Sequence, residues 1–230
     1  MSTTTLSNTN THASSQFFDW CKLSFKLLRK APVTIYALSI ATMVFAGIFQ
    51  ILPAPYGVII SKIVGAMLAP LLWIVLHQVD QYSRFKFSSF KQYSGYRKLP
   101  LLGLVMLLPN ITQMIVAVIV LGDSGIDLVL FGVISNVSKI QIAIILASAA
   151  PVFIIFMFAP AFMLFKHQSV ISATKSSIDT VVQVLPMMLA ILALNAVVLF
   201  LAPFTFALSG LMLGPWLACL TYVAFKQLCL

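Results

Sequence analysis

Long runs of apolar residues alternate with short polar segments along this chain. Each run approaches or exceeds the ~20 residues that an α-helix needs to cross the hydrocarbon core of a bilayer. Helices satisfy their own backbone hydrogen bonds, which makes them suited to lipid. The pattern therefore predicts an all-α polytopic membrane protein with six transmembrane helices, at residues 32–52, 58–79, 100–121, 140–165, 185–207 and 210–225.

The amino-acid composition agrees with this prediction. Hydrophobic residues make up 61% of the chain and charged residues 8%, whereas soluble domains carry about 45–50% and 25%. Water could not solvate so much apolar surface with so few charges, whereas lipid tails solvate it directly. A soluble all-helical protein is therefore the disfavoured alternative.

The basic residues favour one orientation in the membrane, because Lys and Arg concentrate in cytoplasmic segments. With a cytoplasmic N-terminus, twelve of the 14 basic residues fall in cytoplasmic segments, and only Lys62 and Lys139 fall outside. This partition predicts that both termini are cytoplasmic and that the number of spans is even. The basic residues flank apolar runs and form no long basic tract, so the net charge of +9 predicts contact with lipid headgroups and no nucleic-acid partner.

The first 16 residues differ in composition from the rest of the chain. They are rich in Ser, Thr and Asn and lack the basic and apolar regions of a cleaved signal peptide. We therefore expect a disordered tail over residues 1–16 and a single transmembrane domain over residues 17–230.

The transmembrane domain contains an internal repeat. Residues 67–70 (Met-Leu-Ala-Pro) and 157–160 (Met-Phe-Ala-Pro) are each followed, at the same offset, by a His-Gln pair. A third version of the motif ends at Pro215. Similar segments at a regular distance are typical of a structural unit used more than once. The sequence therefore predicts three repeated units, at about residues 17–80, 81–168 and 169–230, each an amphipathic helix followed by a helical hairpin.

The amphipathic helices are expected to lie in the membrane interface, with the apolar face toward lipid and Lys and Arg toward headgroups. The alternative is a connecting helix packed on the bundle. The apolar face predicted for the first helix contains Phe17, Phe18, Cys21, Phe25 and Leu28. That predicted for the third contains Ile171, Thr174, Ile178, Val181 and Leu185. The predicted contacts with headgroups, including those of anionic lipids, are Lys22, Lys26, Arg29, Lys30, Arg84, Lys86, Lys91, Arg97, Lys98 and Lys175.

Small residues lie one helical turn apart at Gly65 and Ala69, and again at Gly210 and Gly214. In lipid this spacing lets helix backbones approach closely. We expect these positions to pack helices of the same chain together. The alternative is a homo-oligomer contact, or a contact with another membrane protein.

Three titratable residues, His77, Asp80 and His167, lie at the cytoplasmic boundaries of the second and fourth spans. His77 and Asp80 are three residues apart and share a helix face, and the repeat suggests that His167 is near. A metal or proton site is one interpretation. The set has no further acidic support, so interfacial capping and headgroup contact are favoured, and no metal or other cofactor is predicted.

The polar residues deepest in the predicted spans are Asn110, Gln113 and Asn195. Polar side chains in lipid commonly hold helices together, which is the favoured interpretation here. Prolines within the third and fourth spans favour an alternative, the broken helices of a transporter. No charged residue lies in the middle of a predicted span, which argues against proton-coupled transport.

Short motifs suggest a family resemblance. They are the Lys/Arg-rich entry at residues 22–30, the Met-x-Ala-Pro segments, residues 173–177 (Ala-Thr-Lys-Ser-Ser) and residues 214–216 (Gly-Pro-Trp). With these motifs the chain resembles bacterial six-span inner-membrane proteins of unknown activity, which are similar to the membrane domain attached to some glycerophosphoryl diester phosphodiesterases. The resemblance implies a six-helix membrane domain. It implies no hydrolase activity, because the acidic and His clusters of the phosphodiesterase domain are missing here.

Soluble-enzyme signatures such as GxSxG, the P-loop and HExxH are absent, and the chain contains no Glu. The leading hypothesis is a non-enzymatic membrane protein with a scaffold or lipid-associated role. One alternative is a transporter or channel for a neutral or lipidic solute. Another is a membrane-embedded enzyme that uses His77, Asp80 and His167.

Overall fold

The computed structural model describes residues 4–86, 93, 99–133 and 137–230, and the side chains from residue 15 onward. No strand lies among these residues. A short 3-10 helix, η1 (Phe49–Ile51), and a short π-helix, η4 (Asp127–Phe131), accompany the α-helices. The helices are α1 (Thr4–Lys30), α2 (Pro32–Ile48), α3 (Tyr56–Leu68), α4 (Leu71–Tyr82), α5 (Leu99–Val105), α6 (Leu108–Leu121), α7 (Asp123–Ile126), α8 (Lys139–Ala147), α9 (Ala149–Phe156), α10 (Ala159–Phe165), α11 (Val170–Gln183), α12 (Leu185–Leu201) and α13 (Leu208–Cys229).

Several of these helices are long and apolar enough to cross a membrane. Five such stretches are Pro32–Ile51, Tyr56–Tyr82, Pro100–Leu121, Lys139–Phe165 and Leu208–Cys229. The pair α11 and α12 would make a sixth, but it is bent by 102°. The all-helical prediction is therefore confirmed, with five or six helical stretches compatible with a multi-pass membrane protein.

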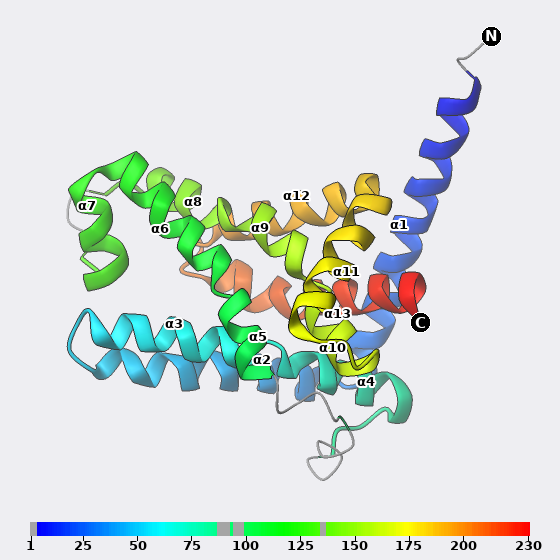
Figure 1. Cartoon of the computed structure of the whole chain (residues 1–230), viewed down its shortest axis with the longest axis horizontal. Helices are drawn as coiled ribbons and strands as arrows, with labels where there is room; N and C mark the ends of the chain where they lie inside the picture. Colours follow the sequence, from blue (N-terminus) through cyan, green and yellow to red (C-terminus); the bar gives the residue numbers. More distant parts are fainter. Residues whose placement is uncertain (1–3, 87–92, 94–98, 134–136) are drawn as a thin grey trace.

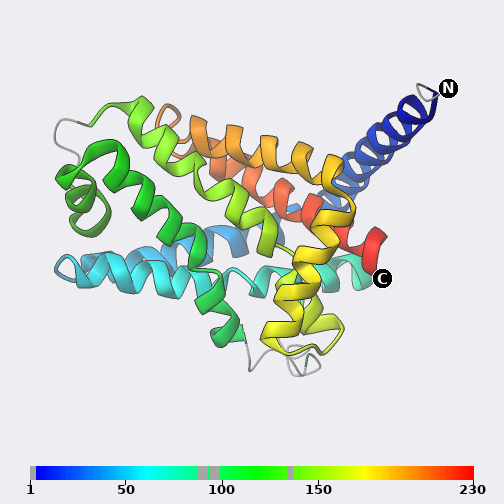
Figure 2. The same ribbon diagram turned by 45° about the horizontal axis from the view of Figure 1, so that its top comes forward.

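The long helices run side by side, with their connections at two opposite ends (Figure 1). One end, called here the α7 end, holds the α2–α3 turn, α7, the start of α8 and the α12–α13 turn. The other end, called the α1 end, holds α1, the end of α4, α11 and the C-terminus. Both α1 and α11 lie crosswise to α12 and α13 there, as Figure 2 also shows. The crosswise helices therefore share one end of the molecule.

Two of the candidate spans are broken at an Ala-Pro motif, and a third is broken between α5 and α6, just before Pro109. Pro70 separates α3 from α4, and Met157 and Phe158 separate α9 from α10 just before Pro160. A proline lacks the N–H that would continue the helical ladder, and free backbone groups are costly in lipid. The buried Ser177 hydroxyl of α11 fills this need at the second break, since it accepts from the Phe158 N–H (3.2 Å) and donates to the Ile155 carbonyl (2.8 Å).

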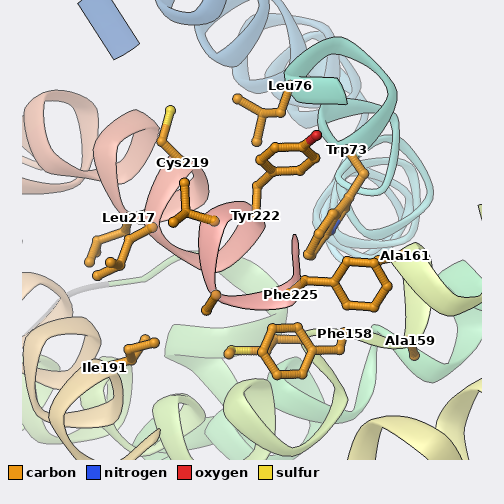
Figure 3. Close-up of a cluster of buried hydrophobic side chains, with 14 of the residues drawn as sticks. Trp73, Leu76, Phe158, Ala159, Ala161, Ile191, Leu217, Cys219, Tyr222 and Phe225 are labelled. Carbon is orange, nitrogen blue, oxygen red and sulfur yellow. The ribbon is translucent and has the colours of Figure 1, made fainter. Parts of the chain in front are cut away.

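The core gathers around the C-terminal helix, α13. The ring centroid of Phe225 lies 5.2 Å from that of Phe162, 5.7 Å from Trp73 and 5.8 Å from Phe158. Figure 3 shows Trp73, Phe158, Tyr222 and Phe225 among aliphatic neighbours from α4, α10, α12 and α13. Aromatic pairs add about 0.5–1.5 kcal/mol each beyond the area they bury. The last helix therefore holds the α1 end of the bundle together.

A close contact between two helix backbones lies at Gly103, a glycine that the sequence did not single out. A Cβ on Gly103 of α5 would come within 2.9 Å of the Met67 Cα in α3, so these two backbones touch. A Cβ on Gly65 would meet only Ala46, at 3.7 Å, and one on Gly210 or Gly214 would meet no described atom within 4 Å. Gly210 and Gly214 line a cavity together with residues of α2 and α4, and make no close backbone contact with a described residue. Spacing reports which residues share a face, but not how closely another helix approaches it.

The first helix begins earlier than the sequence suggests. Residues 4–16, expected as a disordered tail, belong to α1 in the structure. Continuing an existing helix fixes one residue for each hydrogen bond gained, which is easier than starting one. The packed half of α1, from Phe17 onward, supplies that start.

Replacing Gly103 with Ala should destabilise the protein by about 1–3 kcal/mol, because the new methyl would overlap the Met67 backbone. Thermal unfolding of the purified protein in detergent measures this. Gly210→Ala is the matched control, since its methyl meets open space. Equal melting temperatures for the two variants would contradict the α3–α5 contact.

Candidate functional site

A cluster of polar side chains surrounds Asp80 at the α1 end. The Lys30 Nζ donates to the Asp80 carbonyl oxygen (2.8 Å) and lies 3.1 Å from Oδ1. The Lys226 Nζ lies 2.5 Å from Asp80 Oδ2, to which the Tyr222 hydroxyl also donates (3.2 Å). The Tyr222 hydroxyl in turn lies 3.2 Å from the Nδ1 of His77. We call Lys30, His77, Asp80, Tyr222 and Lys226 the Asp80 cluster.

Three helices position this cluster. Lys30 is the last residue of α1, Asp80 lies in the last turn of α4, and Tyr222 and Lys226 are one turn apart near the end of α13. Side chains at i and i+4 share a helix face, so Tyr222 and Lys226 reach the same carboxylate. The cluster therefore ties the first and last helices of the chain to α4.

The charges in the cluster do not balance. One carboxylate faces two ammonium groups, and its side chain is only 15% exposed, against 30% for Lys30 and 42% for Lys226. Ion pairs that reach solvent are screened and contribute modestly to stability. The cluster thus combines a moderate structural tie with an excess of positive charge.

The His77 ring is held among aromatic side chains. Its centroid lies 4.7 Å from Phe165 and 5.9 Å from Tyr93. Burial raises the pKa of the Tyr93 hydroxyl above its usual value, so it stays neutral near pH 7. These contacts assign His77 a packing role, in addition to its hydrogen bond with Tyr222.

The boundary residues predicted as a set do not form one site. His77 and Asp80 are linked through Tyr222, but His167 is exposed between α10 and α11, with φ of 55°. Within the described ranges, no group of three His, Cys, Asp or Glu side chains could hold a metal ion. α4 continues for five residues beyond His77, whereas α10 ends before His167, so the repeat does not bring the two histidines into equivalent positions.

Sequence reasoning missed Tyr222 and Lys226 as members of the site. A signal was available, because acidic residues are scarce in this chain and a carboxylate at the end of a span is expected to recruit basic partners. Only the tertiary structure shows that the C-terminal helix supplies them.

The first crosswise helix divides its side chains among three faces. Trp20, Ser24 and Leu27 are buried against the bundle. Phe18 and Phe25 are instead 63% and 49% exposed, although the Phe25 ring also stacks on Trp216 of α13. The predicted apolar face is therefore divided, because Phe17, Cys21 and Leu28 are partly buried against the core. Beside Phe18 and Phe25 lie the exposed basic residues Lys22, Lys26 and Arg29.

The second crosswise helix, α11, repeats this division. Ala173, Ser177 and Val181 are buried, whereas Ile171 and Val182 are exposed. The predicted face is again split, since Val181 packs on the bundle and Ile171 is 84% exposed. Lys175 is exposed, as the sequence suggested.

The remaining predicted headgroup contacts fall in two groups. Arg84 and Lys86 follow α4 and are exposed. Lys91, Arg97 and Lys98 lie outside the described residues.

The deep polar residues bond within the bundle. The Gln113 side chain donates to the Leu146 carbonyl across α6 and α8 (3.2 Å). The Asn195 side chain donates to Ile191 of its own helix (2.9 Å), and Asn110 is half-buried. The two apolar cavities of the span region, about 150 Å³ and 210 Å³, are lined by other residues. Only Gln113 thus has the predicted role of joining two helices.

Asp80→Asn should lower stability by about 1–2 kcal/mol, less than for a fully buried pair because both lysines reach solvent. Thermal unfolding in detergent measures the loss. Asp179→Asn is the control, since Asp179 is exposed on α11 at the same end. An unchanged melting temperature for Asp80→Asn would show that the cluster does not hold the three helices together.

Comparison with known proteins adds no family. No protein-family model, curated protein or solved structure matches this chain. The resemblance to the membrane domain of glycerophosphoryl diester phosphodiesterases stays a prediction. The function is therefore argued from the arrangement of residues described above.

Proposed function

We propose that this chain is a six-span bacterial inner-membrane protein with both termini in the cytoplasm and a non-enzymatic, lipid-associated or scaffold role. The 102° bend between α11 and α12 supports six spans, because it separates a crosswise helix from one aligned with the bundle. The 17 residues of α12 measure about 25 Å, close to the hydrocarbon thickness. In this proposal α11 and α12 repeat the arrangement of α1 and α2, in which a crosswise helix precedes a spanning helix.

Three repeated units remain the proposed organisation. The Ala-Pro motifs at Pro70 and Pro160 both lie at junctions between helices, which supports equivalent roles in the first two units. Pro215 lies inside α13 without a junction. In the third unit the motif would therefore be present without a break in the helix.

The distribution of charge supports the proposed orientation. Nine basic residues lie at the α1 end: Lys22, Lys26, Arg29, Lys30, Arg84, Lys86, Lys166, Lys175 and Lys226. Lys139 starts α8 at the opposite end, where Asp123 and Asp127 also lie. Because positively charged segments stay in the cytoplasm, the α1 end is the cytoplasmic end.

One observation carries the lipid-associated role: both crosswise helices expose an apolar strip that the bundle covers only in part. In α1 the strip is Phe18 and Phe25, and in α11 it is Ile171, Ile178 and Val182. Exposed basic side chains adjoin each strip. A helix in the membrane interface has this arrangement, with apolar residues in the acyl boundary and Lys or Arg at the headgroups.

A carrier for a lipidic solute is the second candidate. One of the apolar cavities described above, of about 150 Å³, lies beside the helix breaks at Pro70 and Pro160. Trp73 and Met157 also line it. Its walls are almost entirely apolar, which favours an acyl chain over a polar solute. No member of the Asp80 cluster lines this cavity.

Reporter fusions test the topology. Alkaline phosphatase should be inactive after the N-terminus, residue 86 or the C-terminus, because it folds only outside the cytoplasm. It should be active after residue 133, in the connection between η4 and α8. A green fluorescent protein fusion at the same sites should give the opposite pattern. Activity of the phosphatase at either terminus would contradict the six-span arrangement.

Tryptophan quenching by brominated lipid tests the lipid-associated role. Wild-type protein in nanodiscs should be quenched more by brominated phosphatidylglycerol than by brominated phosphatidylcholine. The triple variant Lys22→Gln, Arg29→Gln, Lys175→Gln should lose most of this preference, because each basic residue near the surface contributes about 1 kcal/mol.

The matched control replaces Lys62 and Lys139, which lie outside the α1 end, with Gln. This double variant should keep the wild-type preference. A wild-type protein with no preference for phosphatidylglycerol would rule out the lipid-associated role.

A further inference from the structure

A small cavity opens beside the Asp80 cluster, between α1 and α13. Its volume is about 150 Å³. Leucine and valine side chains form part of its wall. The polar residues that line it are Lys26, Lys30, Asp80, Tyr222, Lys226 and Gln227. The cavity therefore concentrates three ammonium groups and one carboxylate at the end of the bundle.

The lysines that line the cavity keep unused hydrogen-bond donors. An ammonium group has three N–H donors. Lys30 uses two of them on Asp80, and Lys226 uses one. Lys26 forms no hydrogen bond or ion pair with any described residue. Several donors from three side chains are therefore available to one ligand.

The charge around the cavity selects the ligand's sign. Asp80 neutralises one of the three ammonium groups, which leaves an excess of about two positive charges. Asp80 also holds Lys30 and Lys226 in place, so these two charges are fixed before a ligand arrives. A fixed excess of positive charge favours an anion with several acceptor oxygens.

We propose that this cavity binds a phosphate group, carried by an anionic glycerophospholipid or by a soluble phosphate ester. A phosphate offers oxygens in several directions, which suits three lysines on two helices, since lysine binds phosphate as a point charge. The cavity adjoins α1, a proposed interfacial helix, so it would lie at the depth of the lipid headgroups. The lipid form of the ligand rests on the proposed function, whereas the soluble form does not.

Native mass spectrometry of the detergent-solubilised full chain tests the proposal. The protein is titrated with phosphatidylglycerol and, in a separate arm, with glycerol 3-phosphate. Wild-type protein should bind one equivalent of one of these probes. Binding of phosphatidylglycerol that glycerol 3-phosphate does not displace assigns a lipid source. One-equivalent binding of glycerol 3-phosphate assigns a soluble source.

Variants identify the cavity as the place of binding. Lys26→Gln should lower the affinity for the bound probe about fivefold, the factor expected for one basic residue near phosphate. Lys26 holds no other described residue, so this variant should fold normally. Lys166→Gln is the matched control, with the same charge change at the same end but outside the cavity lining.

Equal effects of Lys26→Gln and Lys166→Gln would overturn the proposal. One-equivalent binding by neither probe would overturn it too. A normal lipid preference in nanodiscs with no cavity-dependent binding would refute the cavity and leave the proposed function intact. Cavity-dependent binding of glycerol 3-phosphate without any lipid preference would support the cavity and refute the lipid-associated role.

Discussion

The ion pairs at Asp80 are the interaction on which the α1 end of this protein depends. One carboxylate holds Lys30 at the end of the first helix and Lys226 near the end of the last. Most of the chain between them is apolar, and acidic residues are few in it. Because lipid disfavours unpaired charge, the pairing gathers at one boundary of the bundle. The aromatic contacts of Phe225 then pack α13 against α4 and α10 directly below it.

The crosswise helices serve the bundle and its surface at once. α11 closes the break between α9 and α10, because Ser177 bonds the backbone groups that the break releases. Its opposite side leaves Ile171 and Val182 exposed. α1 likewise buries Trp20 and exposes Phe18. The two interpretations considered for these helices, packing on the bundle and contact with the membrane interface, are therefore compatible, since each helix has one face buried on the bundle and another exposed.

Much of the helical layout could be predicted from the sequence, whereas the site could be predicted only in part. Runs at residues 32–52, 100–121 and 140–165 agree closely with the candidate spans. Asp80 and Lys30 were both singled out, but as separate features. Their contact could not be predicted, because 50 residues separate them. The same holds for Gly103, whose importance depends on the approach of α3.

The sequence by itself determined where helices form and which end carries the positive charge. Both follow from local causes, since hydrophobic run length and the position of Lys and Arg are properties of neighbouring residues. Only the tertiary structure decided which side chains meet. It brought Tyr222 and Lys226 to Asp80, split the faces of α1 and α11, and placed Gly210 and Gly214 beside a cavity instead of a close helix contact. These outcomes depend on how helices distant in the chain pack, and no local pattern carries that information.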